Sequence, residues 1–149
     1  MMDAIDKKIL NIIQKDFPVA EEPFKAVAAK AGISEYEALK RIKDLKDEGI
    51  IRRIGAVFDS KKMGYASTLC AARVPKDKLI KFVAVVNSYP GVTHNYRRKH
   101  DYNVWFTFIA PDKETLKRSL DEIRDKTGIT DIISMIAART FKIDATFEL

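Results

Sequence analysis

The 149-residue sequence lacks most of the residues and motifs from which cofactor and metal sites are built. It has one cysteine, Cys70, so no internal disulfide can form, which favours a reducing, cytoplasmic location. With one cysteine and two histidines, a structural zinc site is not expected. The sequence has no Walker motif, no dinucleotide-binding glycine motif and no spacing typical of a nucleophile–base–acid triad. These absences leave chemistry based on protonation and electrostatics, or binding alone.

Long hydrophobic runs are also missing. No apolar stretch approaches the length of a membrane span, and the N-terminus does not have the basic-then-apolar pattern of a signal peptide. Apolar residues make up 46% of the chain and charged residues 32%, which is typical of a soluble globular protein. The length suits one ordinary domain or two small ones. We therefore expect no membrane association.

Three helices are predicted in the first part of the chain, over residues 4–16, 24–31 and 35–48. Asp3 is a suitable N-cap for the first helix, and Ser34 with Glu37 forms a capping box for the third. The pattern predicts a helix-turn-helix, winged-helix-like module. A strand over residues 51–58 is expected to lead out of it.

The predicted third helix does not have the net positive charge expected of a DNA-recognition helix. It carries four cations and five carboxylates, and residues 1–60 as a whole hold 11 basic and 11 acidic residues. Because phosphate contacts supply most non-specific DNA affinity, we expect this module to serve packing or subunit contacts, with DNA binding unlikely. The remainder of the chain holds 16 basic and 10 acidic residues, so the net charge of +6 lies there and favours an anionic partner.

The remainder is predicted to alternate strands and helices in the order β-α-β-β-α-β, which is typical of a ferredoxin-like domain. The expected elements cover residues 66–74, 76–88, 92–98, 102–109, 113–127, and a last strand region of 131–135 and 139–147. The fold class is therefore α+β. We divide the chain into a helix-turn-helix module with a linking strand, residues 1–58, and a ferredoxin-like substrate or dimerisation domain, residues 59–149.

The predicted central hairpin, residues 92–108 (VTHNYRRKHDYNVWFTF), holds both histidines, the only tryptophan and a run of three cations. Because side chains alternate along a strand, His94, Tyr96 and Arg98 should share one face. The other face should carry Thr93, Asn95 and Arg97. An imidazole, a phenol and a guanidinium together can supply an acid, a stacking surface and a carboxylate clamp.

Structural explanations remain open for several of these residues. The hairpin could turn its polar residues to solvent and pack its aromatic residues in a dimer interface. His100, in the predicted turn, could simply be solvated, and Trp105 could belong to the core. Cys70, in an apolar strand, is expected to be a small buried hydrophobe.

The architecture resembles that of the Lrp/AsnC transcription regulators across nearly the whole chain. Within that superfamily, two segments resemble the sirohaem decarboxylases: GVTHNYRRKHDYNVWFT over residues 91–107 and IRRIGAVFDSKKMGY over residues 51–65. The combined HNY-x-R and YN-x-WFT pattern is more specific than the architecture, and it is intact in this sequence.

The resemblance implies conversion of sirohaem to 12,18-didecarboxysirohaem, on an alternative route to haem or towards haem d1. Two acetate side chains would lose CO2 and become methyl groups. The resemblance also implies that no organic cofactor is needed, that iron arrives inside the substrate, and that the chain pairs with a homologous second subunit as a heterodimer, or with itself as a homodimer.

On this interpretation His94 is the general acid or an axial ligand to the substrate iron, and His100 has the complementary role. Tyr96 and Arg98 complete the catalytic group. The residues expected to hold the substrate are Asn95, Arg97, Tyr102, Asn103, Trp105, Arg52, Arg53 and Lys142. Two other functions remain open: an Lrp/AsnC-type regulator that senses a small molecule, and a tetrapyrrole sensor without turnover.

Overall fold

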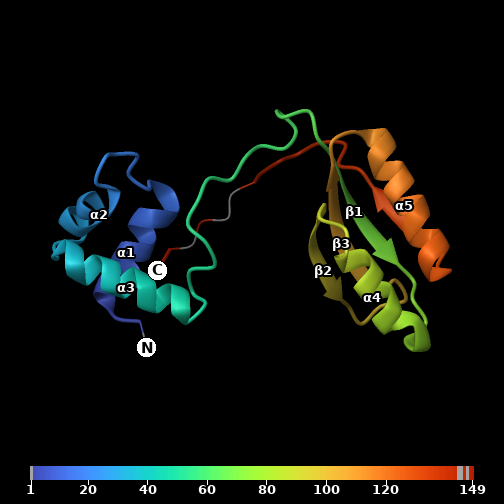
Figure 1. Cartoon of the computed structure of the whole chain (residues 1–149), viewed down its shortest axis with the longest axis horizontal. Helices are drawn as coiled ribbons and strands as arrows, with labels where there is room; N and C mark the ends of the chain where they lie inside the picture. Colours follow the sequence, from blue (N-terminus) through green and yellow to red (C-terminus); the bar gives the residue numbers. More distant parts are fainter. Residues whose placement is uncertain (1, 144–145, 147) are drawn as a thin grey trace. The chain divides into compact units, whose positions relative to one another are not determined.

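The computed structural model describes residues 2–143, 146 and 148–149 (Figure 1). The chain forms two compact units: Met1–Ala56 with Lys142–Leu149, and Val57–Phe141. The boundary lies two residues before the predicted one at residue 58. The end of the chain groups with the first unit, whereas the prediction had placed it in the second domain.

The first unit contains the three predicted helices, α1 (Ala4–Lys15), α2 (Pro23–Ala31) and α3 (Glu35–Asp47). The side chain of Asp3 accepts hydrogen bonds from the first turn of α1 in a capping box, and Ser34 caps α3. Gly32 ends α2 in the left-handed conformation that glycine adopts without strain. The helix-turn-helix prediction is confirmed. Its core consists of Ile9, Leu10, Val27, Ala31, Ile42, Leu45 and Ile51.

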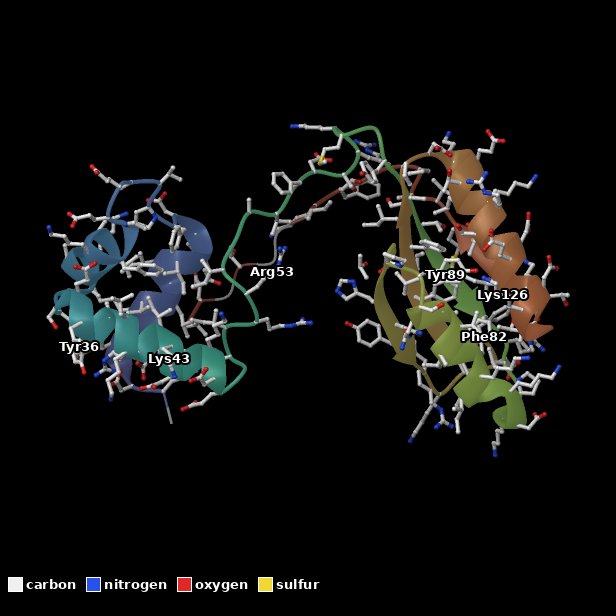
Figure 2. The ribbon with its side chains drawn as sticks, in the orientation of Figure 1. Tyr36, Lys43, Arg53, Phe82, Tyr89 and Lys126 are labelled. Carbon is white, nitrogen blue, oxygen red and sulfur yellow. The ribbon has the colours of Figure 1, made fainter. Side chains whose placement is uncertain are left out.

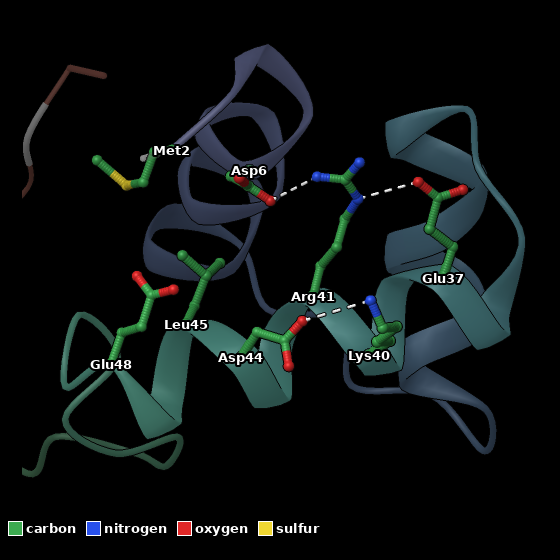
Figure 3. Close-up of a pocket in the computed structure, with 8 residues that line it drawn as sticks. All are labelled: Met2, Asp6, Glu37, Lys40, Arg41, Asp44, Leu45 and Glu48. Carbon is green, nitrogen blue, oxygen red and sulfur yellow. Dashed lines mark hydrogen bonds and ion pairs between the residues drawn. The ribbon is translucent and has the colours of Figure 1, made fainter.

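The charges of α3 are largely paired within the unit (Figure 3). The guanidinium of Arg41 donates to Asp3 and Asp6 at 2.8 Å and to Glu37 at 2.9 Å. Two lysines of the same helix pair with carboxylates one turn further on, Lys40 with Asp44 and Lys43 with Asp47. Arg41 therefore fastens α3 to the start of α1.

The second unit has the predicted β-α-β-β-α-β order. Its four strands form one antiparallel sheet in the order β2-β3-β1-β4, which confirms the ferredoxin-like topology. The elements are β1 (Ala66–Ala72), a short 3-10 turn η1 (Lys76–Lys78), α4 (Leu79–Asn87), β2 (Val92–Arg97), β3 (Val104–Ala110), α5 (Lys113–Thr127) and β4 (Ile132–Met135).

Helices α4 and α5 cover one face of this sheet (Figure 1). Phe82 of α4 packs edge-on against Phe106 of β3, with ring centroids 6.3 Å apart (Figure 2). Cys70 is fully buried in the same core, as predicted, and burial raises the pKa of its thiol to about 11. Among the described residues of this unit, no helix packs on the other face of the sheet, which is called the open face below.

The ends of the two helices are joined by a polar contact beside the sheet. The ammonium of Lys126, on α5, donates to the hydroxyl of Tyr89 at 3.0 Å and lies 5.1 Å from the centre of its ring (Figure 2). The ring of Tyr89 packs against Phe108 of β3, with centroids 5.7 Å apart. The start of β2 is therefore held against both the helix layer and its neighbouring strand.

Two predicted strands are absent from the described residues. Residues 51–58, the predicted linking strand, form no strand, and neither do the described residues of 139–147, which are 139–143 and 146. Residues 144, 145 and 147 lie outside the described residues. A strand requires a hydrogen-bonded neighbour, and alternation alone does not supply one. The alternating Phe141 and Ile143 are instead 86% and 88% exposed.

Within the described residues, none of the helices has the length and apolar character needed to cross a membrane.

Candidate functional site

The open face of the sheet carries a shallow depression of about 430 Å³ between β1, β2 and β3. In the β2–β3 pairing, His94 lies opposite Thr107 and Tyr96 lies opposite Trp105. The predicted grouping of His94, Tyr96 and Arg98 on one face is thus what the structure has. The residues that line the depression are Leu69, His94, Tyr96, Arg98, Trp105, Phe106 and Thr107.

His94 lies on β2 with its imidazole exposed. Its Nδ1 is 3.1 Å from the hydroxyl of Thr93 and 3.3 Å from the hydroxyl of Thr107. The ring lies 6.0 Å from the ring of Tyr96, centre to centre, on the same face. Among the described residues, Nδ1 has these two partners and Nε2 has none, so Nε2 is the nitrogen available to a bound molecule.

Arg98 and Trp105 form the end of the depression near the hairpin turn. The indole N–H of Trp105 donates to the backbone carbonyl of Tyr102 at 2.7 Å, which fixes the plane of the ring. The guanidinium carbon of Arg98 lies 5.8 Å from the centre of the Trp105 rings. Arg98 has no carboxylate partner among the described residues, so its five N–H donors are available to an anionic ligand.

His100 lies in the hairpin turn, outside the depression. Its Nδ1 accepts a hydrogen bond from the backbone N–H of Tyr102 at 3.1 Å, and its ring stacks on the Tyr102 ring at 6.4 Å. The hydroxyl of Tyr102 donates to Asp131 at 2.9 Å, and Arg73 both pairs with Asp131 at 3.2 Å and lies over the Tyr102 ring. The turn is therefore tied to the loop before β4 and to the end of β1.

The chain is similar to known proteins in sequence and in fold. Residues 6–52 match the family model described as "Siroheme decarboxylase NirDL-like HTH domain", and residues 62–142 match the "AsnC-like ligand binding domain". The "Siroheme decarboxylase alpha subunit" of Oleidesulfovibrio alaskensis is 51% identical over 148 residues, which cover 99% of this chain and 90% of that relative. The chain belongs to the siroheme decarboxylase family.

Two solved structures of the family have a similar fold. The crystal structure of the siroheme decarboxylase NirDL matches with a TM-score of 0.73 and 38% identity, over 97% of this chain and 47% of that one. The structure of NirDL in co-complex with an iron-uroporphyrin III analogue matches with a TM-score of 0.71 and 36% identity, over 95% of this chain and 48% of that one.

Three predicted substrate-binding residues of this family member belong to the other unit. Arg52 and Arg53 follow α3 and line a largely apolar groove of about 660 Å³; Arg53 is labelled in Figure 2. Lys142 begins the C-terminal segment of the same unit. Their expected roles towards the substrate stay predictions.

Three further predicted substrate-binding residues are, like Tyr102, on the hairpin but outside the depression. Asn95 faces the helix layer, where its side-chain amide donates to Asn87 at 2.8 Å. Arg97 lies opposite Val104, at the exposed edge of β2. The side chain of Asn103 accepts from the N–H of Val74 at 2.9 Å and donates to its carbonyl at 2.8 Å. The substrate roles of all three likewise stay predictions.

Sequence reasoning missed Thr93, Thr107 and the apolar strip beside the depression. Thr93 was expected on the opposite face from His94, but a register shift between Val92 and His94 brings both beside Thr107. Only the pairing of strands shows this. The strip comes from β1 and β4, which are distant in the chain, and its exposed members are Leu69, Ile133 and Met135.

Proposed function

We propose that this chain is a sirohaem decarboxylase subunit that removes CO2 from two acetate side chains of sirohaem. The observation that carries the proposal is the depression on the open sheet face. It is lined by an imidazole with one uncommitted nitrogen, two aromatic rings and a guanidinium that has no carboxylate partner among the described residues. The relatives that are 47–51% identical over nearly the whole chain support the same reaction.

The reaction needs a proton source and an acceptor for an electron pair. When the bond between the methylene carbon and the carboxylate breaks, its two electrons move into the conjugated macrocycle and CO2 leaves. A proton delivered to a ring carbon prepares the macrocycle to accept that pair. The methylene carbon then takes up a proton to become methyl, and the ring carbon releases its own, so each acetate exchanges CO2 for one proton. No oxidant or reductant is consumed.

In this scheme Nε2 of His94 either delivers the proton or ligates the substrate iron, and His100 takes the complementary role. A well-placed general acid contributes about 10²–10⁴-fold to a rate. The face of Tyr96 and Trp105 suits the flat, apolar surface of a tetrapyrrole. Iron enters as part of the substrate, and the chain supplies no organic cofactor of its own.

Arg98 is positioned to hold a substrate carboxylate. A guanidinium and a carboxylate form two parallel N–H···O bonds, and such charge-assisted pairs are stronger than neutral hydrogen bonds. The excess of cations in residues 61–149, with 16 basic and 10 acidic residues, favours a substrate with several carboxylates. The co-complex of NirDL with an iron-uroporphyrin III analogue is consistent with a ligand of this kind.

We also propose that the active form contains a homologous second subunit or a second copy of this chain, as the word "subunit" in the relatives' names suggests. The exposed strip of Leu69, Ile133 and Met135 on the sheet is suited to such a contact. DNA binding is not expected, because three of the four cations of α3 are paired with carboxylates of the same unit.

The test is anaerobic incubation with sirohaem of the purified protein, with any subunit that co-purifies. Decarboxylation predicts a shift of the sirohaem absorption spectrum and a product lighter by one or two CO2. A spectral shift with no change in mass would indicate a sensor. No shift, together with retention of DNA that weakens steeply with salt, would indicate a regulator.

Two variants sharpen this test. His94→Ala should abolish or strongly reduce CO2 release, and unchanged turnover would refute the assigned role. Lys99→Ala serves as the matched control, because Lys99 is an exposed cation of the same hairpin that does not line the depression. It should leave turnover unchanged.

A further inference from the structure

His94 is held by two hydroxyl groups, of Thr93 and Thr107, to which the sequence motif assigned no role. The hydroxyl oxygens of Thr93 and Thr107 are 2.8 Å apart, and Nδ1 of His94 lies 3.1 Å from the first and 3.3 Å from the second. The three atoms form a closed triangle at the edge of the depression. Two neighbouring strands contribute to it, since Thr107 is on β3 and the other two residues are on β2.

The triangle depends on an irregularity in β2. In a regular strand, successive side chains point to opposite faces, so Thr93 would face the helix layer when His94 faces outward. The pairing of β2 with β3 shifts between Val92 and His94, and both residues reach Thr107 as a result. Irregularities of this kind re-aim side chains and are often found next to active sites.

We propose that Thr93 and Thr107 are positioning residues, which hold the His94 ring through Nδ1 so that Nε2 is directed at the substrate. This inference rests on the proposed function, because it assigns a role in the same reaction. Neither threonine is required to touch the reacting atoms. Both act through the imidazole.

Hydroxyl groups are suited to this role because each can donate one hydrogen bond and accept others. When Nδ1 carries no proton, one threonine donates to it and the other donates to the first threonine. When Nδ1 carries a proton, it donates to one threonine, whose own proton then turns to the other. The ring therefore keeps a partner at Nδ1 whether Nε2 gives up a proton or uses its lone pair to bind a metal ion.

The first experiment compares the histidine ring signals in NMR spectra of the full chain with isotope-labelled histidine, without sirohaem. The double variant Thr93→Val/Thr107→Val keeps the shape of both side chains but removes both hydroxyls. It should change the tautomer balance of His94 and leave the signals of His100 unchanged. Unchanged His94 signals would overturn the proposed contact, whatever the enzymatic result.

The second experiment measures turnover of sirohaem by the protein with its co-purifying subunit. Thr107→Val should lower kcat about 10-fold or more, the usual effect of losing an outer hydrogen bond to a functional histidine, and should leave KM unchanged. Thr107→Ser restores the hydroxyl and should recover most of the lost activity. Thr130→Val, a change at an exposed threonine that does not line the depression, is the control.

The outcomes separate the inference from the proposed function. If the wild type removes CO2 but the valine and serine variants have equal kcat, the positioning role is wrong. If KM rises while kcat stays constant, Thr107 binds substrate directly and the inference is again overturned. If the wild type removes no CO2, the proposed function fails and the catalytic role of the threonines fails with it. An unchanged midpoint of urea unfolding for each variant confirms that folding is not the cause.

Discussion

Replacing Asn103 with alanine should destabilise the second unit strongly, although Asn103 is a polar residue in a motif associated with function. Its side chain makes two hydrogen bonds to the backbone of Val74, at 2.8 and 2.9 Å. These bonds join the turn between β2 and β3 to the segment that follows β1. Alanine would remove both bonds at once.

The size of this destabilisation depends on the backbone groups of Val74 that would lose their hydrogen-bond partners. Val74 is 3% exposed, so its N–H and carbonyl would be left with little access to water. Leaving a buried polar backbone group unpaired costs about 1–3 kcal/mol. With two such groups and some relaxation, the free energy of unfolding should fall by about 2–4 kcal/mol. At a urea m-value of about 2 kcal/mol/M, the midpoint should move by roughly 1–2 M.

The only tryptophan of the chain, Trp105, reports on this change, because it lies two residues away in the same unit. Urea unfolding would be followed by its fluorescence. Asn95→Ala is the matched control, since it removes one exposed side-chain hydrogen bond, to Asn87, and should cost less than about 1 kcal/mol. Equal midpoints for Asn103→Ala and the control would refute the assignment of Asn103 as a backbone clamp.

Three further predictions concern other parts of the chain. Gly91→Ala should destabilise the second unit by at least about 2 kcal/mol in the same fluorescence assay, because the added Cβ would collide with a backbone carbonyl of β3; a wild-type midpoint would contradict this. Cys70 should not react with a thiol reagent at mildly alkaline pH until urea is added, because burial raises its pKa to about 11; rapid labelling of the native protein would disprove its burial. The backbone N–H of Asp6 and the guanidinium of Arg41 lower the pKa of Asp3, so its contribution to stability is present above its ordinary value of 3.8 and is lost as the pH falls through the lower folded pKa. Helix content followed through an acid titration should therefore depend less on pH in Asp3→Asn than in the wild type.

Much of the fold follows from local patterns. Two of the three helices of the first unit, α1 and α3, begin after Asp3 and Ser34 because those side chains cap the first turn. This short-range interaction can be predicted from neighbouring residues. The two strands of the hairpin follow from alternation, as does the grouping of His94 with Tyr96. The prediction of a strand over residues 51–58 was wrong. A strand also needs a neighbouring strand to pair with, and the local sequence pattern contains no information about that partner.

The fold class and the family could be predicted from the sequence, because they depend on periodicity, capping and a motif of consecutive residues. Which side chains keep polar atoms without a partner among the described residues could be seen only in the folded protein. Asn103 is hydrogen-bonded to Val74, and Tyr102 to Asp131. Arg98 has no carboxylate partner among the described residues. The physical reason is that hydrogen bonds join atoms brought together by strand pairing and loop packing. One shift of register was enough to move Thr93 to the side of His94.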